Sequence, residues 1–589
     1  MRRYFLSILL FISFSAMAQT NFLKEWQKAD SLLNLQQPKS VLKIVNNIYA
    51  KANKSNNYEQ ILKSIIYKTT ILNNYEEDNI KKSIDQIKEE IKIAKAPAKQ
   101  VLYSMLAEKY SNYYQENYWQ INRRSITKDK ISEDIDTWDK EKLIFEALKN
   151  YKLSLTETDL LKRTDLKNYD EILIKEKNAK LYRPTLYDFL AHRALDYYKN
   201  ERANLTLPAF VFIIDKADYF AQAETFVNIN LPDADTISFD REALLLYQEL
   251  IKFHLNDASP LALVDVDLSR LDFVKNKSVV AKKEKLYIDA LRERYKKYEN
   301  HDVAAEIGFA LALSFKENEI TNTYNYDEEE SEEERGEEND DKNNYASNKE
   351  AVEICNAIME KYPKTRGAAN CKSLLSEITA PSMSLKTDYA SAADKPALAL
   401  VTYKNIPAVY FKLYLTTPEK LKALKEKNAD ALKNFFLKSK PVKSWEQTLP
   451  NEKDYKTHKA EVKIPELEKG LYVVLSSNEK NFSEKAQLLN ANTFWKTNLS
   501  YLINNGNENN KNEIFVADRT NGEGKANVRI SFFRENYNSP ERNKTYECKT
   551  DKNGFSTLTF PLDDDYGRFS FLLEDGKDKF YSEEYFYNS

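Results

Sequence analysis

The sequence predicts a multidomain protein with an all-α, repeat-like N-terminal half followed by two antiparallel β-sandwich domains. Three observations support this prediction. Apolar residues recur at helical spacing from Phe22 to Ile378, and they alternate with period two beyond Pro381. Most of the 10 glycines lie beyond residue 465, where many turns are expected. At 589 residues the chain is also too long for a single hydrophobic core.

The first residues have the three parts of a secretory signal peptide. Arg2-Arg3 precedes an apolar run from Phe5 to Phe14, and Ala16-Met17-Ala18 supplies small side chains before Gln19. A membrane-spanning helix needs about 20 apolar residues, so this run is too short, and no nearby cysteine indicates a lipid anchor. We expect residues 1–18 to be removed and the mature chain to be exported, soluble, to the periplasm, cell envelope or exterior.

Residues 19–380 are predicted to form the helical region. Their apolar side chains follow short stripes at helical spacing, which polar segments separate. Three stripes are Ile61, Leu62, Ile65 and Ile66; Ile84, Ile87 and Ile91; and Val101, Leu102, Met105, Leu106 and Tyr110. Pro38 and Pro97 fall where helices would begin, a position that tolerates a missing N–H. Paired helices of this length are the unit of tetratricopeptide-like solenoids.

The last predicted helix pair makes the comparison with such repeats most specific. Helices are expected over Ala351–Lys361 and Arg366–Ile378, with a break at Tyr362-Pro363. The small residues Gly367 to Ala369 would permit close packing between helices.

The chain contains three cysteines, Cys355, Cys371 and Cys548, an odd number for an exported protein. The first two lie on consecutive predicted helices, and their spacing allows a disulfide. The simpler interpretation is that both are buried as ordinary small apolar side chains.

The segment from Tyr182 to Leu195 is the densest in residue types that could build a functional site. Asp188 and His192 stand at i and i+4, and Arg193 follows. A carboxylate–imidazole pair without a nucleophile or further ligands defines no reaction. We therefore interpret the segment as an amphipathic helix in which a carboxylate holds His192.

The net charge of −3 conceals one strongly acidic run. Residues 327–341 contain eleven acids and Arg335, a net charge of −10, which leaves +7 for the rest of the chain. The run lacks the ligand spacing of a calcium loop, so residues 327–345 are predicted to be a disordered insert. The basic remainder has no concentrated patch, and a nucleic-acid partner is not expected.

Beyond Pro381 the pattern is that of strands and turns. From Val409 to Leu415 apolar residues alternate with others, and a helical interruption is expected from Glu419 to Phe436. Further strands are predicted over Ala460–Ile464, Leu471–Leu475, Trp495–Ile503, Glu513–Ala517, Ala526–Phe533, Thr545–Lys549, Phe555–Phe560 and Phe569–Leu573. Short strands joined by Asn-Gly and Asp-Gly turns are typical of immunoglobulin-like sandwiches. We place the two domains at 381–492 and 493–589.

Several motifs of this half resemble those of the bacterial alpha-2-macroglobulin family. They are Tyr403-Lys404-Asn405 before the 409–415 strand, Pro465-Glu466-Leu467 with Lys469-Gly470-Leu471-Tyr472, Val516-Ala517-Asp518-Arg519-Thr520-Asn521-Gly522, and Thr550-Asp551-Lys552-Asn553-Gly554. The helical region, especially Arg183–Tyr198 and Tyr362-Pro363, is similar to an N-terminal extension of some bacterial members. The resemblance implies two macroglobulin-like domains and, for the complete protein, inhibition of endopeptidases that cut a bait segment.

The sequence also departs from the family. Members that trap proteases covalently carry Cys-x-Glu-Gln, whereas Cys548 is followed by Lys549-Thr550-Asp551 and neither other cysteine fits. Asn521-Gly522-Glu523 replaces the usual small residue and proline after glycine. Family members are longer than this chain, so we expect it to be the front part of an inhibitor, or a truncated one, without a thioester.

No enzyme signature was found. The nucleophile elbow, phosphate-binding loop, dinucleotide fingerprint and zinc-protease motif do not occur. His192, His254, His301 and His458 share no metal-ligand spacing. We name no catalytic, cofactor-binding or metal-binding residue and expect protein partners: proteases for an inhibitor or, alternatively, envelope proteins for a helical-repeat binding scaffold. A hydrolase of envelope polymers is a third hypothesis, for which no carboxylate stands out.

Overall fold

A computed structural model describes residues 22–75, 79–124, 134–173, 178–199, 212–232, 238–324, 347–428, 430–483, 488–505, 511–535, 543–559, 568–582 and 586–587. The predicted signal peptide, 1–18, and the predicted acidic insert, 327–345, lie outside these residues. The chain divides into two compact units. One takes in Met1–Ser314 and Ala357–Asn370, and the other Phe315–Asn356 and Cys371–Ser589.

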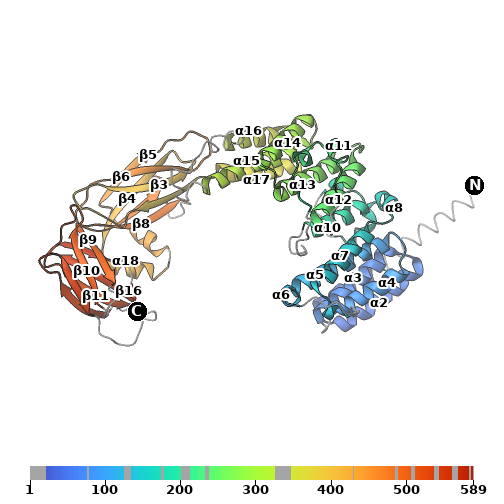
Figure 1. Cartoon of the computed structure of the whole chain (residues 1–589), viewed down its shortest axis with the longest axis horizontal. Helices are drawn as coiled ribbons and strands as arrows, with labels where there is room; N and C mark the ends of the chain where they lie inside the picture. The colour runs from blue at the N-terminus through green and yellow to red at the C-terminus, as the bar shows by residue number, and fades with distance from the viewer. Residues whose placement is uncertain are drawn as a thin grey trace, which may run out of the picture. The chain divides into compact units, whose positions relative to one another are not determined.

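The first half of the described chain is helical, as predicted (Figure 1). Its longer helices are α2 Pro38–Ser55, α3 Tyr58–Tyr75, α4 Asn79–Ile93, α5 Ala98–Glu116, α7 Lys140–Ser154, α10 Leu186–Tyr198, α12 Phe239–His254, α13 Leu261–Lys277, α14 Lys283–Lys297, α15 Ala304–Tyr324, α16 Asn348–Lys361 and α17 Arg366–Thr379. Short helices between them include α6 Tyr118–Ile121, α8 Thr158–Arg163, α9 Ala179–Tyr182 and α11 Ala223–Phe226.

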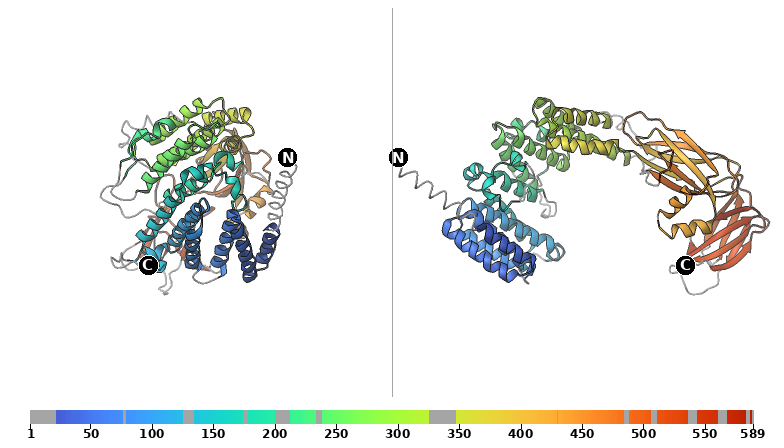
Figure 2. Two further views of the ribbon diagram at one scale, coloured as in Figure 1. Left: turned by 90° about the vertical axis from the view of Figure 1, so that its right-hand side faces the viewer. Right: turned by 180° about the vertical axis from the view of Figure 1, so that it is seen from behind.

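Neighbouring helices along the chain pack against one another. Contacts join α2 to α3, α3 to α4 and α4 to α5, and later α12 to α13 and α13 to α14. The blue helices near the N-terminal end of the described chain lie side by side in the right-hand view of Figure 2. Most members of the three predicted stripes are buried, whereas Ile66 and Met105 are only half-buried. Pro38 occupies the first turn of α2, as predicted, and Pro97 is the residue that precedes α5.

In the described residues of the second half, the strands form four β-sheets. Its strands are β1 Ser382–Thr387, β2 Ala390–Ser391, β3 Ala397–Lys404, β4 Ala408–Thr416, β5 Lys443–Thr448, β6 His458–Ile464, β7 Gly470–Ser477, β8 Leu489–Lys496, β9 Leu499–Asn505, β10 Lys511–Asp518, β11 Arg529–Glu535, β12 Asn543–Lys549, β13 Phe555–Thr559, β14 Arg568–Asp575, β15 Asp578–Tyr581 and β16 Phe586–Tyr587. A three-stranded sheet, β1-β3-β6, is followed by a five-stranded sheet, β2-β8-β7-β4-β5. Two further sheets follow. One is three-stranded, β13-β10-β9, and the other is five-stranded, with the order β12-β11-β14-β15 and with β16 paired to β14.

Two hydrophobic cores organise these sheets. One joins β1, β3 and β6 to one face of β4, β7 and β8, and Val401, Phe411 and Val474 are among its buried members. The other joins the opposite face of β7 to the strands of the last two sheets and to two short helices, α18 Pro418–Lys425 and α19 Ala431–Leu437. These helices are the predicted interruption at 419–436.

Two details of the β half differ from the sequence prediction. The five-stranded sheet with β2 is mixed, because β2 runs parallel to β8. The predicted strand Trp495–Ile503 is two strands in different sheets, β8 and β9. The ladder stops between them because Thr497 Oγ1 and the Asn498 N–H both donate to the buried carboxylate of Asp578, at 2.6 and 3.0 Å. The predicted domain boundary at 492/493 therefore falls inside β8.

Side chains of the family-like motifs form hydrogen bonds with the backbone of the glycine-containing turns. Thr550 Oγ1 donates to the Lys525 carbonyl at 2.6 Å and accepts from the Val528 N–H at 2.9 Å. A carboxylate oxygen of Asp551 accepts the N–H groups of Asn553 and Phe555, both at 2.9 Å. These motif side chains thus hold the backbone of two adjacent loops.

Gly554 and Gly524 let those two loops touch. A Cβ on Gly554 would lie 2.6 Å from the Val516 oxygen and 2.7 Å from the Gly524 Cα, and one on Gly524 would lie 2.0 Å from the Asn553 oxygen. Gly554 also has φ +89°, a left-handed conformation that side chains disfavour.

We expect Gly554→Ala to destabilise this unit by more than about 2 kcal/mol, because left-handed strain of about 1–2 kcal/mol is added to the steric conflict. The matched control is Gly576→Ala, at φ +60° with open space around the position, which carries the strain without the conflict. Urea unfolding followed by circular dichroism would measure both variants. Equal losses would contradict the close approach of the loops.

Candidate functional site

The polar segment singled out in the sequence forms the start of α10. Thr185 caps this helix: its hydroxyl accepts the Asp188 N–H at 3.3 Å, and Asp188 Oδ2 accepts the Thr185 N–H at 2.9 Å. This capping box satisfies N–H groups that have no partner inside the helix. It also fixes the Asp188 carboxylate, which is fully buried.

The buried Asp188 pairs with His254 and not with His192. His254 Nε2 lies 2.8 Å from Asp188 Oδ1, and its Nδ1 lies 2.7 Å from Asp257 Oδ2. Asp188 is in α10, His254 is the last residue of α12, and Asp257 follows in the next loop. Burial alone would lower the pKa of the His254 imidazole, but the hydrogen bonds and charges of both carboxylates outweigh burial and raise it.

His192 and Arg193 do not join this pair. His192 is buried and its Nε2 has no hydrogen-bond partner, so the predicted carboxylate contact is wrong. Burial lowers the pKa of His192 to about 3 and keeps the ring neutral. Arg193 donates to Ser104 Oγ at 2.9 Å and pairs with Glu108 at 3.0 Å. The i, i+4 spacing failed as a guide because His254, distant in sequence, has the better geometry.

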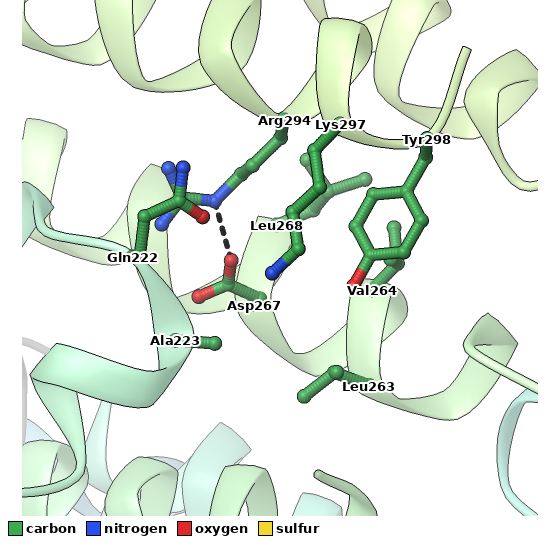
Figure 3. A pocket seen from close by; sticks show the side chains of 9 residues that line it. All are labelled: Gln222, Ala223, Leu263, Val264, Asp267, Leu268, Arg294, Lys297 and Tyr298. Atoms are coloured by element: carbon green, nitrogen blue, oxygen red, sulfur yellow. Dashed lines mark hydrogen bonds and ion pairs between the residues drawn. The ribbon is translucent and has the colours of Figure 1, made fainter.

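A second buried ionic centre lies between α13 and α14 (Figure 3). Asp267 accepts from both Arg270 and Arg294, the latter at 2.5 Å from Nε to Oδ2. The guanidinium groups also donate to the carbonyls of Tyr219 and Ala221. Burial opposes ionisation of Asp267, but the two arginines outweigh it and hold its pKa below the usual range.

Beside this centre lies a small hollow. It is lined by Gln222, Ala223, Leu263, Val264, Asp267, Leu268, Arg294, Lys297 and Tyr298, and its cavity volume of about 10 Å³ is close to the space that one water molecule needs. Small-molecule sites usually occupy roughly 300–1,000 Å³. Lys297 is paired with Glu224 at 2.6 Å, and Asp267 and Arg294 are paired with each other. The charged side chains that line the hollow are therefore paired with other side chains of the fold.

A third centre joins α15 to the start of α17. Glu306 accepts the Gly367 N–H and the Tyr182 hydroxyl, both at 2.9 Å, and pairs with Arg366 at 3.0 Å. A Cβ on Gly367 would lie 2.2 Å from the Ala305 oxygen, so only glycine permits this approach. The predicted close packing at Gly367 is confirmed.

Sequence reasoning missed the pairings within these three centres because the partners are far apart along the chain. One local signal was available: Asp267 and Arg270 stand at i and i+3 on an otherwise apolar face of α13. Charged residues on a buried stripe are seldom tolerated without partners.

In all three centres a buried carboxylate is held in place by hydrogen-bonded partners from other parts of the fold. Each carboxylate accepts hydrogen bonds from an imidazole, a guanidinium or a backbone N–H. Both ring nitrogens of His254 lie against carboxylate oxygens, so neither is placed to activate a serine, threonine or cysteine as a nucleophile. Among these residues, no group of three or more His, Cys, Asp or Glu side chains is arranged to hold a metal ion. No helix in the described ranges is long and apolar enough to cross a membrane.

Comparison with known proteins gives limited similarity. No protein-family model matches the chain, and no curated protein does. Native alpha-2-macroglobulin from Escherichia coli, in a structure spanning domains MG0-NIE-MG1, is 14% identical over 34% of this chain and 64% of that one, with a TM-score of 0.27. A structure spanning its domains NIE-MG1 is 13% identical over 34% of this chain and 95% of that one, with a TM-score of 0.25.

A third similar structure is the N-terminal part of the bacterial S-layer protein SbsC. It is 12% identical over 83% of this chain and 99% of that one, with a TM-score of 0.15. Superpositions at these TM-scores do not define a shared fold, and the chain matches less than two thirds of the first of these structures.

We expect His192→Leu to reduce the loss of stability in acid. Because the folded pKa of His192, about 3, is below the ordinary histidine pKa of 6.5, protonation of His192 favours unfolding, and stability falls as the pH drops below about 6.5. The wild type should lose on the order of 2–3 kcal/mol through this group at about pH 4.5. Urea unfolding at pH 7 and at pH 4.5 measures the difference; equal losses in variant and wild type would rule out a buried neutral ring.

His254→Gln should show the opposite pH dependence. Its folded pKa is raised, so its contribution is fully present below the unfolded pKa and is lost as the pH rises through the folded pKa. We expect a loss of about 3 kcal/mol at pH 6 and a smaller loss at pH 9. The same unfolding assay gives both values, and a deficit that stays constant with pH would contradict the two-carboxylate arrangement.

Proposed function

We propose that this chain is an exported, non-catalytic, macroglobulin-like protein that acts on endopeptidases by binding and without a thioester. In this proposal the β half forms two immunoglobulin-like, macroglobulin-like sandwiches, and the helical half forms a tetratricopeptide-like extension. Residues 381–496 and 499–589 would be the two sandwich domains.

The observation that carries the proposal is the ordered set of family-like motifs in the β half. Asp518 is the last residue of β10 and Arg519 follows it, and Thr550, Asp551 and Gly554 lie in the turn between β12 and β13. Arg519 donates to the Leu499 carbonyl at 2.7 Å, and Asp518 Oδ1 accepts the Thr520 N–H at 2.9 Å. The residues that resemble the family thus occupy positions where side chain and backbone depend on each other, which supports a common domain design.

The absence of a thioester sequence decides the mode of action in the proposal. Cys548 lies in β12, is half-buried, and burial raises the pKa of its thiol. A raised pKa disfavours the thiolate, which is the reactive form. Inhibition would therefore depend on steric enclosure of the protease and not on a covalent bond from this chain.

A binding scaffold of the cell envelope is a second candidate, favoured by the exposed apolar residues of the helical unit. Trp119 in α6 is 75% exposed, and Ile93 at the end of α4 is 68% exposed. Tryptophan is enriched among residues that dominate binding energy at protein interfaces. This candidate requires a partner for the helices and no effect on proteases.

The first test is the intact mass and N-terminal residue of the native protein isolated from the cell envelope. We expect processing before Gln19 and, if the chain is the front of a larger inhibitor, a product considerably larger than the 68.7 kDa precursor. The purified product is then incubated with an endopeptidase. Steric enclosure predicts loss of cleavage of a large protein substrate while cleavage of a small peptide substrate persists.

The outcomes separate the two candidates. Unchanged cleavage of both substrates at excess purified protein would overturn the inhibitor proposal and leave the scaffold. An unprocessed chain that remains in the cytoplasm would overturn both.

A further inference from the structure

Cys355 and Cys371 meet inside the helical hairpin formed by α16 and α17. Cys355 lies six residues before the end of α16, and Cys371 lies five residues after the start of α17. Antiparallel helices joined by a short turn bring residues equally far from that turn opposite one another. The two thiols are accordingly in hydrogen-bond contact, and neither takes part in a disulfide in the structure.

The surroundings of the two cysteines favour a structural disulfide over a reactive thiol. Both cysteines have no exposed surface, and Ile358 and Leu374, one helical turn away from each, are also buried. A reactive or redox-sensing cysteine needs access to solvent and a cationic neighbour, whereas a structural disulfide needs two close cysteines whose bond forms before burial. The positions fit the second description.

We propose that Cys355 and Cys371 form a disulfide that fastens α16 to α17 in the exported protein. The inference rests on the export that belongs to the proposed function, because disulfides persist in oxidising compartments and are rare in the cytosol. It adds a covalent modification that the sequence analysis left open.

The chemistry is a thiol–disulfide exchange with an oxidant such as glutathione disulfide. A thiolate of one cysteine attacks a sulfur of the oxidant, and the first glutathione thiol leaves. The second cysteine then attacks this mixed disulfide, and the second glutathione thiol leaves. Two thiols lose two electrons and two protons, and the oxidant gains them. Because both cysteines are buried in the folded chain, the exchange takes place during folding.

The bond would close a loop of moderate length between the two helices. Such a loop restricts the unfolded chain and stabilises the folded one. The segment that it closes carries Arg366 and Gly367, the partners of Glu306. The disulfide would therefore also oppose local unfolding of the segment that holds these two residues against Glu306.

The test counts thiols in the native protein taken from the cell envelope. The protein is unfolded in guanidinium chloride with N-ethylmaleimide and without reductant, and its intact mass is measured. We expect one adduct, on Cys548, and three adducts after prior reduction. Cys548→Ala should give none without reductant, and Cys355→Ala should give two, because Cys371 then has lost its partner.

Three adducts on unreduced wild-type protein would overturn the proposal. The same spectrum reports the N-terminus: a chain processed before Gln19 with three thiols would leave export intact and remove only the disulfide, whereas an unprocessed chain would identify export as the failure. Reduction should also lower the Tm of the wild type by roughly 5–10 °C and leave that of a Cys355→Ala/Cys371→Ala double variant unchanged. A wild-type Tm insensitive to reduction would contradict a stabilising bond.

Discussion

The β half depends on the burial of strand β7 on both of its faces. Tyr472 and Val474 point into the core shared with the three-stranded sheet β1-β3-β6, while Leu471, Val473 and Leu475 point into the core shared with the last two sheets. A strand of this kind cannot be solvated on either side, so its neighbours must supply cover in both directions. The short helices α18 and α19 contribute Leu424 and Phe436 to the second core, which explains why a helical interruption follows β4. Strand β7 therefore links two separate hydrophobic cores, one on each of its faces.

The helical unit meets a different constraint, the partnering of buried charge. Asp188, Asp267 and Glu306 are all nearly inaccessible to solvent, and each is held by groups from another helix or loop. A buried carboxylate without a partner would cost several kcal/mol. Each centre therefore makes the position of one helix depend on another, and apolar stripes that would tolerate sliding are fixed in register. Aspartate, glutamate, histidine and arginine, which are common in catalytic sites, thus have a structural role in these centres.

The extent to which the sequence predicted this protein follows from how local each signal is. The helical stripe at Ile84, Ile87 and Ile91 and the alternation at 409–415 are local patterns, and both became the expected elements. The strand break at Thr497 was missed because it depends on Asp578, about eighty residues further along the chain. Likewise, the pairing of Asp188 was assigned to the near histidine, whereas 66 residues separate it from His254. Periodicity predicts which face of an element is buried, but it does not identify the polar group from a distant segment that pairs with that face.

The same distinction bears on what the family-like motifs can mean. Thr550 and Asp551 direct their oxygen atoms to backbone N–H groups of their own loops, and Gly554 is required by a steric approach and a left-handed backbone. The oxygen atoms that make these contacts thus serve the fold. Selection for the fold alone would retain these motifs whether or not the chain inhibits proteases. Evidence for function must then come from groups that the fold does not require, and Trp119, which is exposed on a short helix, is such a group. Trp119 is a bulky apolar side chain, so a partner that covered it would remove a large apolar area from water.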